Sequence, residues 1–265
     1  MELLRCFSTL GCPSASLDDV REIARRHNLP LVELRALDGT LELADHFETA
    51  FGSPAGFAER LRQTSVQVVA LDTSARLIGG SEHDWRNLER LAPWADAAAI
   101  PWLRVFDGGS TGTTAEIDEA IAHARRWRER RDRQGWRVDI LVETHDALTR
   151  SAAILQFCAG CDAAVLWDAH HTWKRGGEDP VDTWRATGSR VKHIHVKDSM
   201  PDANGANGWS YVLPGTGRFP MQPLLRELTH SKFQGAVSLE WERQWVPTLP
   251  PLEIALASAE KTGWW

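Results

Sequence analysis

The chain alternates between short apolar runs and longer amphipathic segments along its whole length, and this alternation most constrains its fold. Runs rich in Val, Ile and Leu predict β-strands. Eight such runs lie at 3–8, 30–36, 66–72, 101–107, 137–144, 163–168, 191–197 and 235–241. Several are apolar throughout, which is typical of strands covered on both faces. The pattern therefore predicts a mainly parallel sheet.

Amphipathic helical patterns separate these strands. They lie at 16–27, 84–99, 113–131, 145–160, 180–188, 221–231 and 250–262. Strand and helix in regular succession favour a parallel sheet with right-handed crossovers. Eight strands in 265 residues predict a closed (β/α)₈ TIM barrel rather than a doubly wound sheet. No linker divides the chain, so we expect a single domain over residues 1–265.

Composition and charge narrow the class of protein. A chain that is 43% hydrophobic and 25% charged is globular rather than disordered. The net charge of −6 argues against a nucleic-acid partner, since such proteins usually carry a basic patch. No apolar run approaches the ~20 residues that cross a membrane, and the N-terminal apolar stretch is short for a signal peptide. We expect a cytoplasmic protein with no membrane partner.

The cysteines carry little signal. A Cys-x-x-Cys pair, Cys158 and Cys161, follows an apolar helical stretch. A structural zinc site normally needs two further ligands, and a redox pair normally opens a helix. We therefore interpret these residues as buried or incidental thiols, reduced in the cytoplasm.

Four ionisable residues lie at or near the ends of four successive predicted strands: Glu143, Asp168, His195 and Glu240. The carboxyl ends of the strands in a TIM barrel meet at one mouth, where catalytic groups gather. We expect no arginine beside each of these acids to cancel its charge. Crowded carboxylates repel one another unless a cation lies between them. Three carboxylates and an imidazole suit a divalent metal. Solvated loop acids or helix caps are the alternative reading.

Other polar residues share the inward faces of these strands. Alternation along a strand places Glu143 with His145, His193 with His195 and Lys197, and Glu240 with Glu242. Those nearest a strand's C-terminal end are predicted to reach a ligand bound at the mouth.

Further charged residues lie near other strand ends. Arg35, Arg104 and Lys197 either bind a substrate hydroxyl, phosphate or carboxylate, or neutralise neighbouring acids. Asp72 and Asp107 are expected to cap the helices that follow them.

The longest irregular stretch, 198–220, follows the seventh predicted strand and is expected to overhang the mouth. Long loops in compact domains are usually functional or mobile. Within it, the glycine-rich segment 214–217 either presents backbone N–H groups to an anion or forms a double turn.

Four motifs resemble those of a known family. They are ETHDA (143–147), the Asp-x-x-His of WDAHH (168–171), HIHVKD (193–198) and GAVSLEWER (235–243). Together they resemble the xylose isomerase-like TIM-barrel superfamily, and within it the sugar phosphate isomerase/epimerase branch, which includes ketose 3-epimerases and inosose dehydratases. The resemblance covers nearly the whole chain in the correct strand order.

The resemblance implies roles for individual residues. Glu143, Asp168, His195 and Glu240 match the family's metal ligands, with Mn²⁺ or Mg²⁺ the usual ion and Co²⁺ or Zn²⁺ also used. Glu143 and Glu240 match the carboxylate pair that removes and returns a proton of an enediolate. His171 matches a histidine that contacts the substrate.

The candidate substrate-binding residues include some that lie outside the four motifs. It comprises His171, Lys197, Arg243, Arg35, Arg104 and His145. Epimerases of this group often carry an arginine shortly after the metal histidine, whereas Lys197 and Asp198 occupy that stretch here.

Several functions remain open at this point. The first is an isomerase or epimerase acting on a sugar, sugar phosphate or polyol through an enediolate. The second is a lyase, such as a dehydratase acting on a keto-sugar or inosose at the same site. An endonuclease IV-like nuclease and a non-catalytic relic of the barrel complete the set. Trp245, Trp264 and Trp265 mark either a homo-oligomer interface or packing of the last helix.

Overall fold

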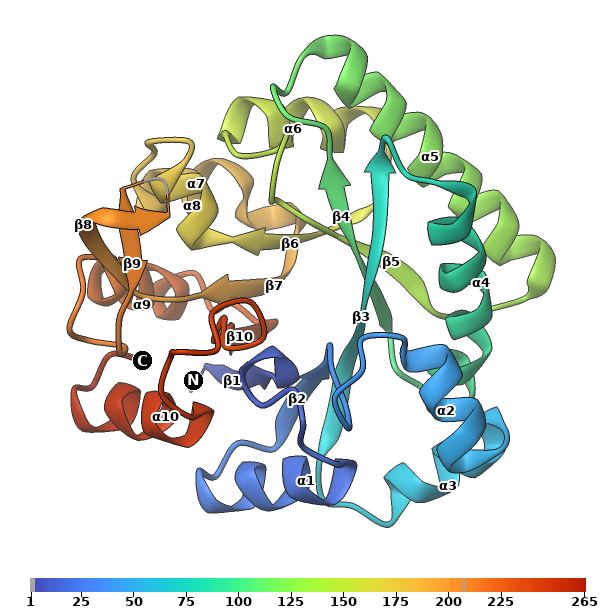
Figure 1. Ribbon diagram of the computed structural model, residues 1–265. Helices are drawn as coiled ribbons and strands as arrows, with labels where there is room; N and C mark the ends of the chain where they lie inside the picture. Colours follow the sequence, from blue (N-terminus) through green and yellow to red (C-terminus); the bar gives the residue numbers. More distant parts are fainter. Residues whose placement is uncertain (1–2, 207) are drawn as a thin grey trace.

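The computed structural model describes residues 3–206 and 208–265, and in it eight parallel strands close into a barrel (Figure 1). The order around the barrel is β1-β10-β7-β6-β5-β4-β3-β2. The strands are β1 Leu4–Ser8, β2 Leu31–Leu34, β3 Gln67–Ile78, β4 Trp102–Gly108, β5 Asp139–Glu143, β6 Ala164–Asp168, β7 Val191–Val196 and β10 Ala236–Leu239. The predicted (β/α)₈ barrel is confirmed.

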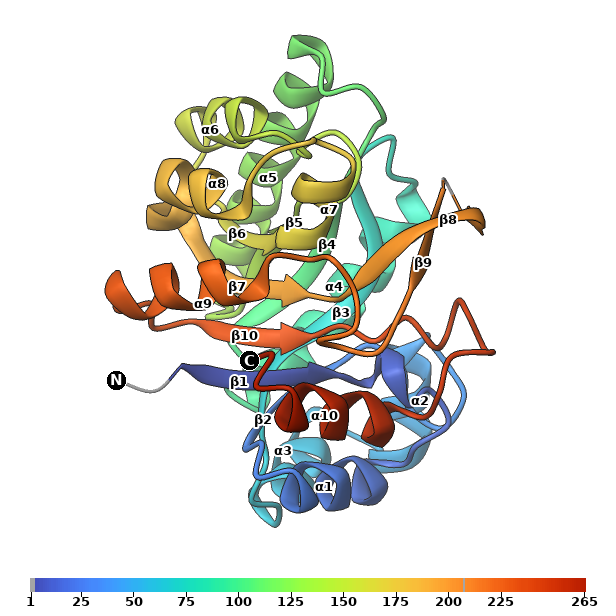
Figure 2. The same cartoon turned by 90° about the vertical axis from the view of Figure 1, so that its left-hand side faces the viewer.

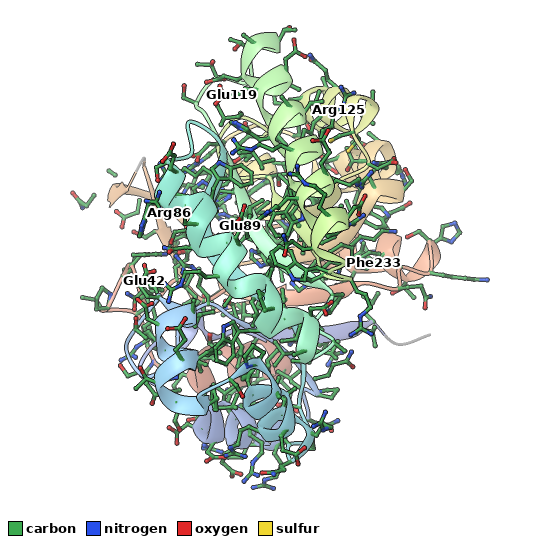
Figure 3. The ribbon with its side chains drawn as sticks, turned by 90° about the vertical axis from the view of Figure 1, so that its right-hand side faces the viewer. Glu42, Arg86, Glu89, Glu119, Arg125 and Phe233 are labelled. Carbon is green, nitrogen blue, oxygen red and sulfur yellow. The ribbon has the colours of Figure 1, made fainter. Side chains whose placement is uncertain are left out.

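Helices surround the barrel on its outside (Figure 1). They are α1 Leu17–Arg26, α2 Leu43–Phe51, α3 Pro54–Arg62, α4 Glu82–Ala97, α5 Thr114–Gln134, α6 Ser151–Gly160, α7 Ala169–Lys174, α8 Pro180–Thr187, α9 Met221–His230 and α10 Leu252–Lys261, with short 3₁₀ turns at Thr9–Gly11 and Gly188–Arg190. The prediction did not include α2, α3 or α7. Figure 3 shows the face that α4 and α5 form, with charged side chains such as Arg86, Glu89 and Glu119 on it.

The sequence determines where several helices begin. Ser16 and Asp19 form a capping box at the start of α1, in which each side chain bonds the other residue's backbone N–H. Thr113 and Glu116 do the same for α5. Such caps satisfy N–H groups that have no partner within the helix.

The core lies between the strands and the helices. Apolar strand residues such as Val32, Leu103, Val142 and Ile194 are fully buried there. Because successive strand residues point to opposite faces, the residues between them point into the barrel. Many of these inward residues are polar, and this is what positions the site.

One predicted helix, 145–160, begins only at Ser151. The preceding segment is a loop that Asp107 holds in place. Its carboxylate accepts three backbone N–H bonds from this loop, including those of Asp146 at 2.9 Å and Leu148 at 2.6 Å. The expectation that Asp107 caps the helix after its own strand was therefore wrong, because these N–H groups occupy its carboxylate.

The stretch 198–220 is not irregular throughout. It contains an antiparallel hairpin of β8 (Ser199–Ala206) and β9 (Trp209–Tyr211). Figure 2 shows this hairpin beyond the C-terminal ends of β7 and β10, over the mouth as expected.

The glycine-rich segment 214–217 does bind a carboxylate, and that carboxylate belongs to the chain itself. Asp198 accepts the backbone N–H groups of Gly215 and Gly217, both at 2.9 Å, and that of Phe219 at 3.1 Å. The segment therefore anchors the hairpin to the end of β7.

The tryptophans near the C-terminus differ in exposure. Trp264 and Trp265 are only 4% and 8% exposed, whereas Trp245 is 56% exposed. Packing of the last helix therefore accounts for Trp264 and Trp265, which belong to the core cluster beside α10, and of the three only Trp245 is exposed enough to mark an interface.

The four cysteines are free thiols. Burial raises the pKa of both Cys158 and Cys161, and a raised pKa makes a thiol less reactive. Among the described residues, none of the helices combines the length and apolar character needed to span a membrane.

Candidate functional site

The four predicted metal ligands lie together at the C-terminal mouth of the barrel. Glu143 and Asp168 are the last residues of β5 and β6, His195 lies in β7, and Glu240 directly follows β10. Each offers one ligand atom, and these atoms all lie within 4.8 Å of one another. None of the four side chains is more than 5% exposed. The cluster is therefore compact and shielded from water.

The imidazole of His195 points its two nitrogens at different acids. Its Nε2 lies 3.0 and 3.1 Å from the carboxylate oxygens of Glu33. Its Nδ1 lies 3.5 Å from Glu143 Oε1 and 3.3 Å from Glu240 Oε2. A proton on Nε2 bonded to Glu33 leaves the Nδ1 lone pair facing the cluster, as a metal-binding histidine requires.

Glu33 was not among the predicted site residues. It lies in β2, is fully buried, and accepts a hydrogen bond from Ser238 Oγ at 2.7 Å. His193 Nε2 lies 2.9 Å from it. The available signal was its position in the predicted strand 30–36, where alternation puts Glu33 on the same inward face as Arg35.

The field of the cluster is strongly negative at His195. Burial disfavours the charged imidazolium, but Glu33, Glu240 and Glu143 outweigh burial and raise the pKa of His195 well above its ordinary value. A proton is thus drawn to the place where a cation would lie.

Basic residues do pair with these acids, which is one of the two alternatives left open for Lys197 and Arg104. Lys197 Nζ lies 2.9 Å from Asp168 Oδ2 and 2.6 Å from Glu242 Oε1, and it also bonds Glu240. Arg104 Nε lies 3.3 Å from Glu143 Oε2. The cause is strand alternation, since these basic residues also lie on inward faces of the barrel.

The site still fits a divalent cation. Both oxygens of Glu143 and Nδ1 of His195 are buried and have no hydrogen bond to any described residue. Buried polar atoms without partners are costly, and a bound ion would satisfy these three. The charges agree, since the buried acids Glu33, Glu143, Asp168, Glu240 and Glu242 outnumber the buried cations Arg35, Arg104 and Lys197.

A bulge in β3 organises the basic side of the mouth. The register between β3 and β4 shifts between Asp72 and Arg76. The carbonyl of Thr73 accepts a bond from Arg104 Nη1 at 3.0 Å, and Ser74 Oγ accepts one from Arg35 Nη2 at 2.8 Å. Bulges often re-aim side chains next to active sites, and this one holds both arginines.

Asp72 lies inside the barrel and does not cap the next helix, contrary to expectation. It is 1% exposed, and Arg104 Nη2 is 3.9 Å from its Oδ2. Burial and the charge of Glu33 raise the pKa of Asp72 to about 8, although Arg104 lowers it. The carboxyl group is therefore mainly protonated at neutral pH.

Two candidate substrate-binding histidines lie beside the cluster. His171 Nδ1 is 3.1 Å from Asp168 Oδ2, and the ring centroids of His145 and His171 are 4.6 Å apart. Arg243, the other predicted substrate-binding residue of the late motif, instead donates from Nε to the carbonyl of Leu249, at 3.2 Å.

The hairpin contributes to the mouth as well. Tyr211, the one tyrosine of the sequence, donates from its hydroxyl to Glu242 Oε1 at 3.3 Å. Ser199 Oγ lies 2.7 Å from His170 Nε2. Glu242 was expected on the same inward face as Glu240 but was given no role. Tyr211 was not predicted, because no period or motif marks contacts between a loop and a strand end.

The sequence profile of the family described as "Xylose isomerase-like TIM barrel" matches residues 21–262. The chain belongs to this family. The family agrees with the closed barrel and with the resemblance carried by the four motifs.

Curated relatives match only part of the chain. An inosose dehydratase from Clostridium botulinum (strain Eklund 17B / Type B) is 27% identical over an aligned stretch of 105 residues, and the match covers 35% of this chain and 34% of that protein. The chain thus matches about a third of the length of these relatives.

Solved structures match the whole barrel at low identity. The probable 3-DHS dehydratase AsbF from Bacillus anthracis has a TM-score of 0.77 at 17% identity, covering 97% of this chain and 98% of that one. The IolI protein with a bound zinc atom has a TM-score of 0.73 at 17% identity, covering 99% and 96%. A D-tagatose 3-epimerase-like protein has a TM-score of 0.67 at 14% identity, covering 98% of each. At these identities the likeness shows the fold alone.

Proposed function

We propose that this protein is a metal-dependent isomerase or epimerase that moves a proton next to the carbonyl of a sugar, sugar phosphate or polyol. One observation carries the proposal. The carboxylates of Glu143 and Glu240 both approach Nδ1 of His195, at 3.5 and 3.3 Å, in a buried cluster. Two carboxylates at one dry centre suit proton removal and return.

Glu143, Asp168, His195 and Glu240 would hold one divalent ion. When bound, the ion would polarise a substrate carbonyl as a Lewis acid. Three oxygen ligands to one nitrogen favour Mn²⁺ or Mg²⁺. The zinc in the IolI structure keeps Zn²⁺ among the ions to test.

Both proposed proton carriers are ionised at neutral pH. Burial raises the pKa of Glu240, but Lys197 and His195 outweigh it and hold that pKa well below the ordinary value. For Glu143, burial is outweighed chiefly by Arg104, and its pKa is also lowered. Each carboxylate is therefore ready to accept a proton, and Arg104 keeps Glu143 oriented.

A dehydratase is the second candidate, and one feature favours it. Lys197 joins Glu240 to Glu242, and Tyr211 extends this chain of hydrogen bonds toward the mouth. Elimination of water needs a base for the α-proton and an acid that protonates the leaving hydroxyl. Glu143 and the Lys197–Glu242 pair would supply them, and the partial match to inosose dehydratases agrees with this candidate.

Metal content and isotope exchange together test the proposal. We expect about one Mn, Mg, Co or Zn per chain by elemental mass spectrometry, lost in His195→Ala. Ketoses, inososes and their phosphates incubated in D₂O should take up deuterium with unchanged product skeleton, and Glu240→Gln should abolish uptake. Glu82→Gln, whose side chain is 94% exposed, is the matched control.

The outcomes separate the candidates. A product lighter by one water would support the dehydratase over the isomerase. A protein that binds no ion after incubation with each of the four metals would overturn both candidates and leave a binding protein on an inherited barrel.

A further inference from the structure

Arg35 is a buried cation without an acid. Arg35 directly follows β2 and is 2% exposed, and its side chain donates from Nη2 to Ser74 Oγ at 2.8 Å. Its other terminal nitrogen, Nη1, is buried and has no hydrogen bond, and no carboxylate of the described residues forms an ion pair with Arg35.

Arg104 is the informative contrast, since it lies in the same field and is equally buried. Its Nε faces Glu143 at 3.3 Å, and its Nη1 donates to the carbonyl of Thr73 at 3.0 Å. Arg104 is thus committed to the chain's own groups, and it positions a proposed ligand. Arg35 keeps one end of its guanidinium free.

No described acid forms an ion pair with Arg35. Asp72, Glu143 and Glu240 act on its charge from farther away, and the raised pKa of Asp72, about 8, leaves that carboxyl mainly uncharged at neutral pH. A charge without an ion-pair partner is unfavourable in a protein interior. A chain that retains such a charge in its mouth is arranged for an anion that arrives with a ligand.

The position of Arg35 is also well defined. Thr9 Oγ1 accepts the backbone N–H groups of Arg35 and Ala36, at 2.9 and 3.0 Å. Ser74, to which the guanidinium is bonded, is exposed. The guanidinium therefore lies just beneath the surface, held in one orientation, and Glu143 and Glu240 are near enough to act on its charge.

We propose that the free end of Arg35 binds a carboxylate of the substrate, so that the natural substrate is a keto-polyol carrying a carboxylate. The inference rests on the proposed function and names its substrate class. A planar guanidinium pairs well with a carboxylate. One free end supplies a single positive charge, which matches a monoanion better than a phosphate dianion, and a neutral hydroxyl would leave the charge unpaired.

Binding measured without turnover tests this inference. Titration calorimetry would compare quinate, a cyclic polyol with a carboxylate, with neutral myo-inositol and with myo-inositol 1-phosphate. D-Gluconate and D-glucitol form a second, open-chain pair. Each titration is made on chelator-treated and on Mn²⁺-loaded protein. We expect at least one carboxylate to bind about tenfold or more tightly than its neutral partner, as a hydrogen-bonded charge pair implies.

Three variants locate the effect. Arg35→Gln should reduce carboxylate affinity about 10- to 100-fold and leave affinity for the neutral polyol unchanged. Arg35→Lys should retain part of the preference, and it serves as the test if the glutamine variant does not fold. Arg86→Gln, on the exposed outer face of α4 (Figure 3), should behave like wild type.

Equal binding of acids and neutral polyols, a preference for the phosphate ester, or a carboxylate preference that survives both Arg35 variants would each overturn the inference. Metal content is measured on the same samples. A chain that binds metal without any carboxylate preference keeps the proposed function and loses the substrate class. A chain that binds carboxylates through Arg35 but no metal loses the proposed function and keeps the subsite.

Discussion

The two ends of the barrel differ in what they enclose. A cavity of about 750 Å³ opens at the N-terminal end, where Leu31, Val69, Trp102 and Phe233 line it. Its charged lining residues include Arg185 and Glu227, which pair with each other at 2.8 Å. The C-terminal mouth instead holds the dense cluster of buried acids and bases.

This difference shows that size alone does not locate function in such a barrel. The cavity is lined by apolar side chains together with polar ones, such as Lys192 and the Arg185–Glu227 pair. At the C-terminal mouth, the buried atoms that have no hydrogen bond to any described residue include both oxygens of Glu143, Nδ1 of His195 and Nη1 of Arg35. A group bound at the mouth would satisfy these atoms, whereas residues at the opposite end of a barrel contribute to the stability of the fold.

Glu33 connects the two ends. Its carboxylate lies 3.0 Å from Nε2 of His195, in the cluster. It also lies 2.9 Å from Nε2 of His193, which lines the N-terminal cavity. Glu33, His193 and His195 thus form a hydrogen-bonded layer, the Glu33 layer, between two ends that differ in chemistry. Variants at the mouth, in this layer and at the N-terminal end test whether a change at one end affects the other.

The largest effect is expected at the mouth. Glu240→Gln should lower kcat about 10²- to 10⁴-fold, the contribution typical of one general acid or base, and should weaken metal binding as well. Deuterium uptake or substrate turnover measures the first effect, and elemental mass spectrometry the second. A variant that retains full turnover would remove Glu240 from the chemistry.

Asp72→Asn should change how stability depends on pH. The folded-state pKa of Asp72 is about 8, against an ordinary 3.8, so between these values the folded protein holds a proton that the unfolded chain has lost. Wild-type stability from this group is therefore highest at low pH and falls as pH rises through this window, by about 1.4 kcal/mol per pH unit. The variant lacks this slope.

Denaturant unfolding of wild type and Asp72→Asn at several pH values from 5 to 8 measures the difference. We expect the variant to gain stability relative to wild type by on the order of a few kcal/mol across that range. Parallel stability curves would mean that Asp72 is ionised in the folded protein, and that Arg35 has an anionic neighbour after all.

Glu33→Gln should lower metal affinity about 10- to 100-fold, the usual cost of losing a partner that orients a metal-binding histidine. Glu33 touches no proposed ligand atom directly, so it is a positioning residue. Metal titration calorimetry measures the loss, and Glu33→Asp should recover part of it. An unchanged affinity would show that packing alone orients His195.

Much of the fold was predictable because the sequences of buried parallel strands are continuous apolar runs. The mouth acids were predictable because Glu143, Asp168 and Glu240 end or follow such runs, and position at a strand end is readable without knowing any contact. No helix was predicted between 36 and 66, where the structure has α2 and α3. Each has only 9 residues, and Gly52 ends the first while Pro54 begins the second, so neither shows a long helical pattern.

Pairings between side chains were not predictable in the same way. Lys197 and Arg104 were recognised as inward residues, but whether each would meet an acid or a substrate depends on side-chain rotamers and on the β3 bulge. Alternation puts Glu33 on an inward face with Arg35, but no pattern in the sequence indicates that it meets His195, which lies 162 positions farther along the chain. Tyr211 reaches Glu242 from a hairpin whose Gly- and Pro-containing sequence suggested a loop.

The smallest effect is expected at the N-terminal end. Ser231→Ala removes the hydroxyl that accepts the indole N–H of Trp184 at 3.1 Å, beside the large cavity. The loss of one such bond should lower the free energy of unfolding by about 1 kcal/mol, measured by denaturant unfolding, because a partly buried N–H is left without its acceptor. Turnover and metal content should stay within twofold of wild type. A tenfold fall in turnover with metal content intact would show that the N-terminal cavity is coupled to the mouth through the Glu33 layer, and the two ends would then have to be treated as one functional unit.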